Sequence, residues 1–232
     1  MAVFGGPNVI DNGLVLSLDA GNVKSYPGSG TIWYDKSGGR NNGTLTNGPT
    51  FSGGSIVFDK VDDYIEVANQ IQFERTNSFT LSAWINTNDA NNNQIINNET
   101  SGYRGYQLAI DLNSKLFFFL RNTVGSNFMG IVCVNSFIPN IWTHVLCTYN
   151  GSSFASGATI YINGVQQQTE IRGDSLTDTT ISNETTWIGY RRPSTQGPFN
   201  GRISQVSIYN RALSAQEVLQ NYNATKSRFN IT

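Results

Sequence analysis

The sequence predicts an all-β protein built as an antiparallel sandwich, and three observations support this. Apolar and polar residues alternate in about a dozen short runs. Asn-Gly dipeptides separate several of these runs, and only one segment shows a helical period. Because alternation with a period of two is typical of half-buried strands, many short runs with frequent turns favour a sandwich over β-α-β units.

The predicted strands follow one another along most of the chain. In the run 79–86 the odd positions are apolar, while Trp84 lies on the polar side. The segment 159–166 is predicted as a hairpin, because Asn163-Gly164 suits the positive φ angles of a type I′ turn. The other runs lie at 14–19, 55–59, 63–67, 94–97, 105–111, 116–120, 128–134, 142–149, 185–190 and 201–209.

One segment near the C-terminus predicts a short helix instead. Ser214 is placed to be its N-cap, and Glu217 stands at the third helical position, as in a capping box. Leu213 and Val218 have the spacing of a hydrophobic staple across the same helix start.

The run 116–120, Leu-Phe-Phe-Phe-Leu, is apolar on both faces of its predicted strand. Leu116, Phe118 and Leu120 can enter the core from one face of the strand. Phe117 and Phe119 then lie on the other face and need to be covered from outside the core. That cover comes either from loops of the same chain or from a partner subunit. We therefore treat Phe117 and Phe119 as candidate interface residues.

Composition excludes several classes of function. Charged residues make up 13% of the chain and the net charge is −1, so no basic surface for nucleic acid is expected. No apolar run has the length of a membrane span, and the N-terminus lacks the basic and apolar regions of a signal peptide. We expect no nucleic-acid partner, no membrane insertion and no export signal.

Catalytic residues are scarce. His144 is the only histidine, and Cys147 lies three positions away on the opposite strand face, so the two form no local dyad. Glycoside hydrolysis needs two carboxyl groups about 5–9.5 Å apart. Asp62 and Glu66 are the only local candidates, and their spacing is better explained by a turn that enters a strand. We expect no enzymatic activity.

Cys133 and Cys147 lie in runs predicted to be neighbouring strands, where a cross-strand disulfide is one alternative. Two buried free thiols are the favoured alternative in a chain of this length without an export signal. Two cysteines and one histidine without paired spacing do not predict a zinc site.

Binding chemistry is better represented than catalysis. Flat aromatic rings beside guanidinium groups suit sugars, and two loops combine the two residue types. Trp84 offers a third aromatic face, although it would be unavailable if it packs under a loop. The candidate ligand-binding residues are Trp84, Tyr103, Arg104, Tyr106, Tyr190 and Arg191, and the last is followed by Arg192 and Pro193.

Several short motifs are spread along most of the chain. They include Gly13-Leu-Val-Leu-Ser-Leu-Asp19, Trp33-Tyr-Asp-Lys-Ser-Gly38, Trp142-Thr-His-Val145, Tyr161-Ile-Asn-Gly164 and Ile208-Tyr-Asn-Arg-Ala-Leu-Ser214. These motifs resemble those of the laminin G-like, concanavalin A-like lectin/glucanase domain, in the style found in structural proteins of tailed bacteriophages. The resemblance implies a two-sheet jelly roll over residues 13–223, between an arm at 1–12 and a tail at 224–232, with the strands at 14–19 and 201–209 close together.

The resemblance also implies a function. We expect a non-enzymatic, lectin-like structural protein of a phage virion, in a capsid decoration, tail or fibre, that binds host surface glycans. Its partners would be other virion proteins or copies of itself, and it would be made in the host cytoplasm. The alternatives are a decoration protein without glycan affinity and a glycan hydrolase of the same superfamily.

Some relatives in this superfamily bind calcium through acidic residues near strand ends. Here the last strand reads Ile203-Ser-Gln-Val206 and lacks the carboxylates that often stand there. Asp19, Asp35 and Asp63 remain as oxygen donors for calcium, which prefers such ligands. The resemblance predicts no cofactor and leaves calcium open.

Overall fold

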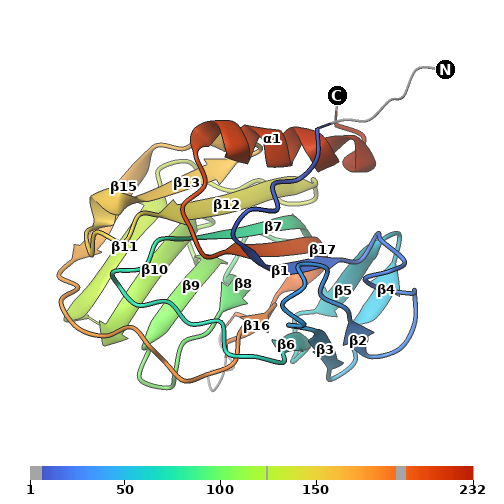
Figure 1. Ribbon diagram of the computed structural model, residues 1–232, viewed down its shortest axis with the longest axis horizontal. Helices are drawn as coiled ribbons and strands as arrows, with labels where there is room; N and C mark the ends of the chain where they lie inside the picture. The colour runs from blue at the N-terminus through green and yellow to red at the C-terminus, as the bar shows by residue number, and fades with distance from the viewer. Residues whose placement is uncertain (1–6, 124, 192–196, 232) are drawn as a thin grey trace.

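The computed structural model describes residues 7–123, 125–191 and 197–231, so part of the predicted arm, the last residue of the tail, Arg192 and Pro193 lie outside the described residues. The described strands form two antiparallel sheets that pack face to face as a jelly-roll sandwich (Figure 1). This confirms the predicted fold class.

The first sheet is ordered around one long strand, β17. Its order is β14 (Val165–Gln166), β13 (Ala158–Ile162), β12 (Thr143–Tyr149), β7 (Phe79–Thr87), β17 (Asn200–Tyr209), β5 (Ser55–Asp59) and β4 (Thr50–Ser52). A further strand, β1 (Leu14–Asp19), also pairs with β17. β7 pairs with one edge of β17, whereas β5 and β1 pair with different parts of its other edge.

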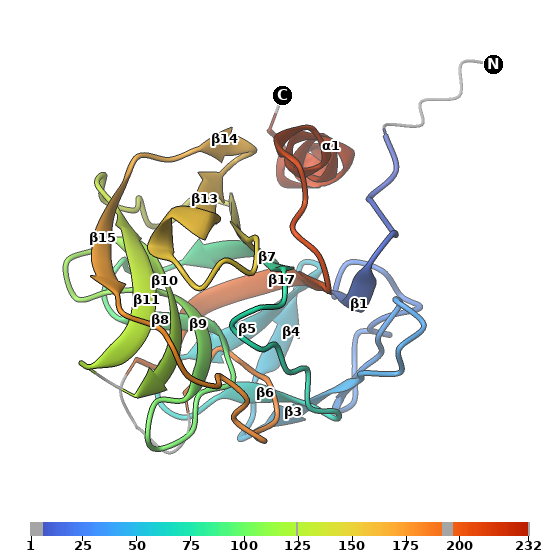
Figure 2. The same cartoon turned by 60° about the vertical axis from the view of Figure 1, so that its left-hand side comes forward.

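The second sheet carries the surface that concerns function. Its order is β15 (Thr169–Asp174), β11 (Asn127–Cys133), β10 (Leu116–Thr123), β9 (Gly105–Ile110), β8 (Asn93–Asn97), β16 (Trp187–Ile188), β6 (Tyr64–Val67), β3 (Gly43–Thr46) and β2 (Ile32–Trp33). Figure 2 shows β8 to β11 beside one another, with β15 at their edge.

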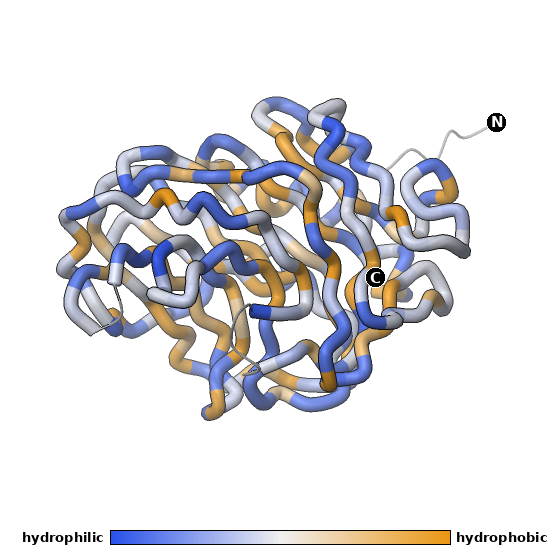
Figure 3. Tube along the Cα trace, turned by 90° about the horizontal axis from the view of Figure 1, so that it is seen from below, coloured by the Kyte–Doolittle hydropathy of each residue, from blue (hydrophilic) through white to orange (hydrophobic). Residues whose placement is uncertain are grey.

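The core lies between the two sheets, where the apolar face of each strand is buried. In β10, Leu116, Phe118 and Leu120 point into this core, as predicted, and Phe117 and Phe119 face outward. Figure 3 shows apolar stretches along the interior strands and hydrophilic stretches at many outer turns. The outward face of β10 therefore needs its own packing arrangement.

The C-terminal helix α1 (Ala215–Thr225) covers the outer face of the first sheet (Figure 2). The predicted capping box is confirmed, since Ser214 accepts from Glu217 N–H and the Glu217 carboxylate accepts from Ser214 N–H. Leu213 and Val218 are both buried in one cluster beneath it. Among the described residues, no helix is both long and apolar enough to cross a bilayer.

Two details correct the sequence analysis. The strands β2, β3, β4 and β15 were not predicted, because they are short or, as in β15, carry few apolar residues and lie exposed at an edge. Cys133 and Cys147 were placed on neighbouring strands, but β11 and β12 belong to opposite sheets. Both cysteines are free thiols and both are buried.

Candidate functional site

The outer face of the second sheet is hollowed into two adjoining pockets, which share Asp111, Phe117 and Arg121. We call them together the outer hollow. The first has a volume of about 340 Å³, and its walls include Phe119, Phe128, Val132 and Arg172. The second has a volume of about 290 Å³, and its walls include Gln94, Tyr103, Gln107, Leu112 and Arg191.

The aromatic floor of the outer hollow is placed by glycines on the neighbouring strands. Gly130 pairs with Phe119 across β10 and β11, and a Cβ at Gly130 would collide with the phenyl ring of Phe119. Gly173 pairs with Gly130 from β15, and a Cβ there would collide with the ring of Phe128. Each ring therefore occupies the space above a glycine of the neighbouring strand, and the two rings meet edge to face at a centroid distance of 5.8 Å.

A buried charge cluster forms the polar side of the outer hollow. The Glu99 residue is 0% exposed, while Arg121 and Arg191 are each 8% exposed. Arg121 Nη1 donates to Glu99 Oε1 at 2.6 Å, and Arg191 Nε lies 3.0 Å from Glu99 Oε2. The second contact is ionic rather than an aligned hydrogen bond, since Glu99 Oε2 accepts none. One carboxylate thus lies between two guanidinium groups.

Aromatic rings and amides hold both guanidinium groups in place. The Arg121 guanidinium lies 4.0 Å from the centroid of the Phe119 ring, and that of Arg191 lies 4.1 Å from the centroid of Tyr103. Arg121 Nη1 also donates to Gln107 Oε1 at 3.1 Å, and Gln107 Nε2 donates to Gln94 Oε1 at 2.7 Å. A polar network therefore crosses β8, β9 and β10.

The electrostatics of the cluster follow from burial. Burial raises the pKa of the Glu99 carboxyl, and the charges of Arg121 and Arg191 oppose that rise. Burial also lowers the pKa of the Arg121 guanidinium, which the Glu99 charge opposes. Removing one partner of such a pair leaves a buried charge without compensation and costs about 3–5 kcal/mol.

Chemically, the outer hollow is suited to binding. It offers phenyl and phenol rings, side-chain amides and guanidinium N–H groups within one concave surface. Among the described residues that line it, Asp111 is the only carboxylate, so it presents no pair of acids for glycoside hydrolysis.

The sequence-predicted site residues separate into two groups. Tyr103 and Arg191 lie in the outer hollow together with Phe117 and Phe119, which were predicted as interface residues. Arg104 does not line it, although it belongs to the same loop as Tyr103. The ligand-binding and interface predictions thus converge on one surface.

Tyr106 and Tyr190 are occupied elsewhere. Tyr106 is 1% exposed, and its hydroxyl lies 3.0 Å from the Ile71 carbonyl oxygen and 2.9 Å from Thr186 Oγ1, so it is a core residue. Tyr190 stacks on Tyr64 at a centroid distance of 5.6 Å. Neither side chain lines the outer hollow.

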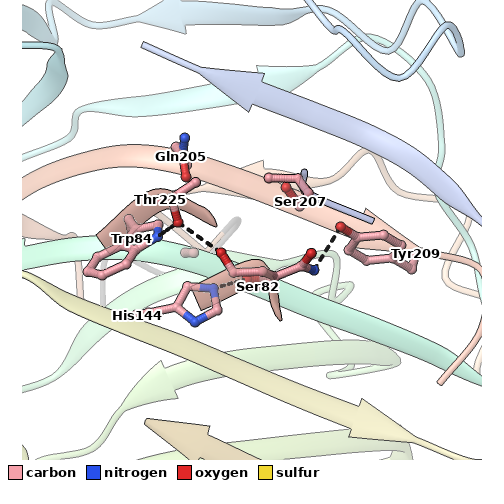
Figure 4. Close-up of a pocket in the computed structure, with 10 residues that line it drawn as sticks. Ser82, Trp84, His144, Gln205, Ser207, Tyr209 and Thr225 are labelled. Atoms are coloured by element: carbon pink, nitrogen blue, oxygen red, sulfur yellow. Dashed lines mark hydrogen bonds between the residues drawn. The ribbon is translucent and has the colours of Figure 1, made fainter. Parts of the chain in front are cut away.

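Trp84 does not offer a face to a ligand in this structure, because α1 and the following 3-10 helix (Lys226–Phe229) cover it. It is 1% exposed, stacks on Phe229 at 4.2 Å and donates from Nε1 to Thr225 Oγ1 at 2.8 Å. Figure 4 shows it beside His144, which lies 2.8 Å from Ser82 Oγ through Nε2. The cavity between them measures only about 20 Å³, room for a water molecule.

The acidic candidates also take separate positions. Glu66 lines a polar cleft with Glu184 and Trp187, which Asp62 does not line. Asp62 instead clusters with Asp59 and Asp63, with ligand oxygens within 4.8 Å of one another. Burial and the charges of its two neighbours raise the pKa of Asp63 to about 6, although a hydrogen bond from Asp59 N–H opposes the rise.

The three proposed calcium donors do not meet at one place. Asp19 is paired with Arg228 through two contacts of 2.8 Å. Asp35 accepts from the backbone N–H groups of Ser17, Ser37 and Asn41. Only Asp63 has neighbouring carboxylates, and three such oxygens are fewer than the 6–8 ligands that calcium takes.

Sequence reasoning missed Arg121 and Glu99. Arg121 follows Phe117 and Phe119 at a spacing of two, so strand parity places it on the same face and was a usable signal. Glu99 follows the end of β8 in a loop, and its burial depends on Arg121 and Arg191, which are distant in sequence.

Solved structures of toxin binding domains resemble this chain. For the binding domain of Paraclostridial Mosquitocidal Protein 1, the TM-score is 0.70 at 21% identity, covering 92% of this chain and 52% of that chain. The botulinum neurotoxin serotype D ligand binding domain in complex with N-acetylneuraminic acid gives 0.63 at 20% identity, with coverages of 92% and 51%. The binding domain of botulinum neurotoxin DC in complex with rat synaptotagmin II gives 0.65 at 20% identity, with coverages of 93% and 52%.

These likenesses show the fold alone, and the chain spans about half of the length of each toxin domain. No curated protein matches the chain. The family model of the concanavalin A-like lectin/glucanases superfamily matches residues 59–219, which is more than half of the sequence and includes the whole outer hollow. The protein therefore belongs to the concanavalin A-like lectin/glucanase superfamily.

Proposed function

We propose that the protein is a non-catalytic carbohydrate-binding module whose binding site is the outer hollow. The observation that carries the proposal is the convergence of Phe119, Tyr103, Arg121 and Arg191 on one concave face. Sugar rings expose C–H faces that pack on aromatic rings, while their hydroxyl groups accept from guanidinium N–H groups.

Structural relatives support a binding role without assigning a ligand. One toxin domain is in complex with N-acetylneuraminic acid and another with rat synaptotagmin II, so both a glycan and a protein receptor occur among domains that contain this fold. The combination of aromatic rings with guanidinium and amide groups in two pockets of about 340 and 290 Å³ favours a glycan over a protein segment for this chain.

We also propose that the module is a lectin-like structural component of a phage virion, in a capsid decoration, tail or fibre. Support comes from the sequence motifs that resemble those of tailed-phage structural proteins. In this role the protein would be made in the host cytoplasm, would contact other virion proteins or copies of itself, and would bind host surface glycans. Immunogold labelling of purified particles tests the placement, and particles that carry no label would contradict it.

A glycan array tests the binding function. We expect the wild-type protein to bind a defined glycan class and Tyr103→Ala to reduce that binding at least tenfold, because Tyr103 stacks on Arg191 at the wall of the hollow. Tyr34→Ala is the matched control, since Tyr34 is 46% exposed and does not line the hollow. Absence of binding across the array would favour a purely structural decoration protein.

The hydrolase alternative requires a different result. Glu66 is the predicted acid that lies in a cleft with a second carboxylate, Glu184. Release of reducing sugar from bacterial surface polysaccharide by the wild type, and its loss in Glu66→Gln, would replace the binding proposal with a catalytic one.

A further inference from the structure

We infer that the outer hollow selects glycans that carry a carboxylate, and that Arg121 and Arg191 hold this acid group. The inference rests on the proposed function, which it deepens by naming the ligand class. It starts from the charge balance of the cluster: one carboxylate, Glu99, faces two guanidinium groups. The cluster therefore has one excess positive charge.

Within the described parts of the chain, the other charged groups that line the outer hollow form no ion pair with this cluster. Arg172 lines the first pocket, but it is paired with Glu170 at 3.3 Å. The Asp111 carboxylate already accepts from the backbone N–H groups of Asn113 and Lys115 through Oδ1. A carboxylate that enters the hollow would balance the excess charge of the cluster.

Arg121 has donors available for such a ligand. A guanidinium carries five N–H groups, and the hydrogen bonds of Arg121 to Glu99 and Gln107 both use Nη1. Within the described parts of the chain, Nε and Nη2 of Arg121 have no acceptor, and Arg121 lines both pockets. The planar guanidinium fork matches a carboxylate in two-point contact.

The donors are also held rigidly, which favours selectivity. Each guanidinium is fixed on one side by Glu99 and on its flat face by a ring, Phe119 for Arg121 and Tyr103 for Arg191. Because the two arginines are each 8% exposed, little water competes for them. Charge-assisted hydrogen bonds made by such fixed and desolvated groups are stronger than those of solvated surface arginines.

The test compares matched oligosaccharides by isothermal titration calorimetry: an oligomer of uronic acid, the same oligomer with its carboxyl groups reduced to alcohols, and the reduced oligomer carrying sulfate. We expect the wild type to bind the uronic acid oligomer at least tenfold more tightly than the reduced one. This preference should shrink in Arg191→Gln, because affinity for the uronic acid oligomer falls by a larger factor than affinity for the reduced oligomer.

A second variant guards against misfolding. Arg191→Lys keeps a positive charge beside Glu99, so no buried charge loses its partner, but it removes the planar guanidinium fork. We expect the preference of this variant for the acid to lie between those of the wild type and Arg191→Gln. Raising the salt concentration should weaken acid binding by the wild type and leave binding of the reduced oligomer unchanged.

The outcomes separate the inference from the proposed function. Equal affinity for the uronic acid and reduced oligomers would overturn the carboxylate assignment and leave the carbohydrate-binding function standing. A preference for the sulfated oligomer over the uronic acid oligomer would also overturn the carboxylate assignment. No binding of any of the three, in a protein that binds no glycan on an array, would overturn the proposed function itself.

Discussion

His144 illustrates how burial alone sets the chemistry of a residue. Burial lowers the pKa of His144 to about 3, and its neighbours in the cavity beneath α1 are Ser82 and Trp84. The ring is therefore neutral in the folded protein at pH values where a histidine in the unfolded chain, with a pKa near 6.5, is protonated.

This difference predicts a loss of stability in acid. Between pH 6.5 and pH 3 the unfolded state binds a proton that the folded state does not, so the free energy of unfolding falls as pH decreases. The contribution of His144 to the slope of the free energy of unfolding against pH approaches about 1.4 kcal/mol per pH unit. Urea denaturation at pH 7, 6 and 5 should show a steeper decline for the wild type than for His144→Gln.

That comparison isolates His144 from the carboxyl groups. The pKa of Asp63 is raised to about 6, so this group increases the free energy of unfolding as the pH falls below 6. The wild type and His144→Gln share this contribution, so it does not affect the comparison between them. Because the chain has one histidine, its ring resonance can be followed by NMR without assignment of others. A ring that titrates near pH 6.5 would contradict the predicted burial effect.

The two thiols lead to a second prediction at this scale. Burial raises the pKa of Cys133 to about 12 and that of Cys147 well above its usual value. Since the thiolate is the reactive form, we expect neither cysteine to react with iodoacetamide in the folded protein and both to react in urea. Alkylation detected by mass spectrometry before unfolding would contradict this.

The sequence around Tyr103 and Tyr106 does not show which of the two tyrosines is buried in the core. Both lie in one loop region, but β9 begins at Gly105, so Tyr106 enters the core while Tyr103 remains over Arg191. The deciding factor is where the strand begins. The three residues of the buried charge cluster come from β10 and two loops, and only the fold brings them together.

Among the elements, α1 follows from local sequence signals at its N-terminus. Its N-cap, its capping box and the burial of Leu213 and Val218 in one cluster all agree with the sequence pattern. We expect Ser214→Ala to lower the free energy of unfolding by about 1 kcal/mol through loss of the cap. Ser29→Ala, at an exposed position, is the control and should leave stability unchanged.

The strand pair β10 and β11 leads to a sharper prediction. An added methyl group in Gly130→Ala would displace the Phe119 ring, so we expect weaker glycan binding and a destabilisation of about 1–3 kcal/mol. In a Phe119→Ala background there is no ring to displace, and the same substitution should have little effect on stability. Equal effects in both backgrounds, measured by urea denaturation, would contradict the proposed packing.

Strong alternation made most strands predictable, since the boundaries of β1 and β5 match the sequence analysis and several others differ by one residue. The strands that escaped prediction were short or exposed, such as β4 and β15, where pairing to a neighbour rather than an apolar pattern sets the structure.

At the scale of the whole molecule, one face cannot serve both a glycan and a partner subunit. Phe117 is 8% exposed, and Phe119 is covered in part by Arg121 and Phe128. We therefore expect the isolated protein to sediment as a monomer at high concentration. A dimer that dissociates when glycan is added would place the subunit interface over the outer hollow and contradict this prediction.

The position of β17 has a consequence for synthesis. β17 separates β7 from β1 and β5, and its Gln205 pairs with Asp19, 186 positions earlier in the chain. At ribosomal rates of about 5–20 residues per second, β17 is synthesised roughly 10–40 s after its partner strand β1. During that interval the edges of three strands lack their native partner, so the first sheet closes only after translation has reached the end of β17.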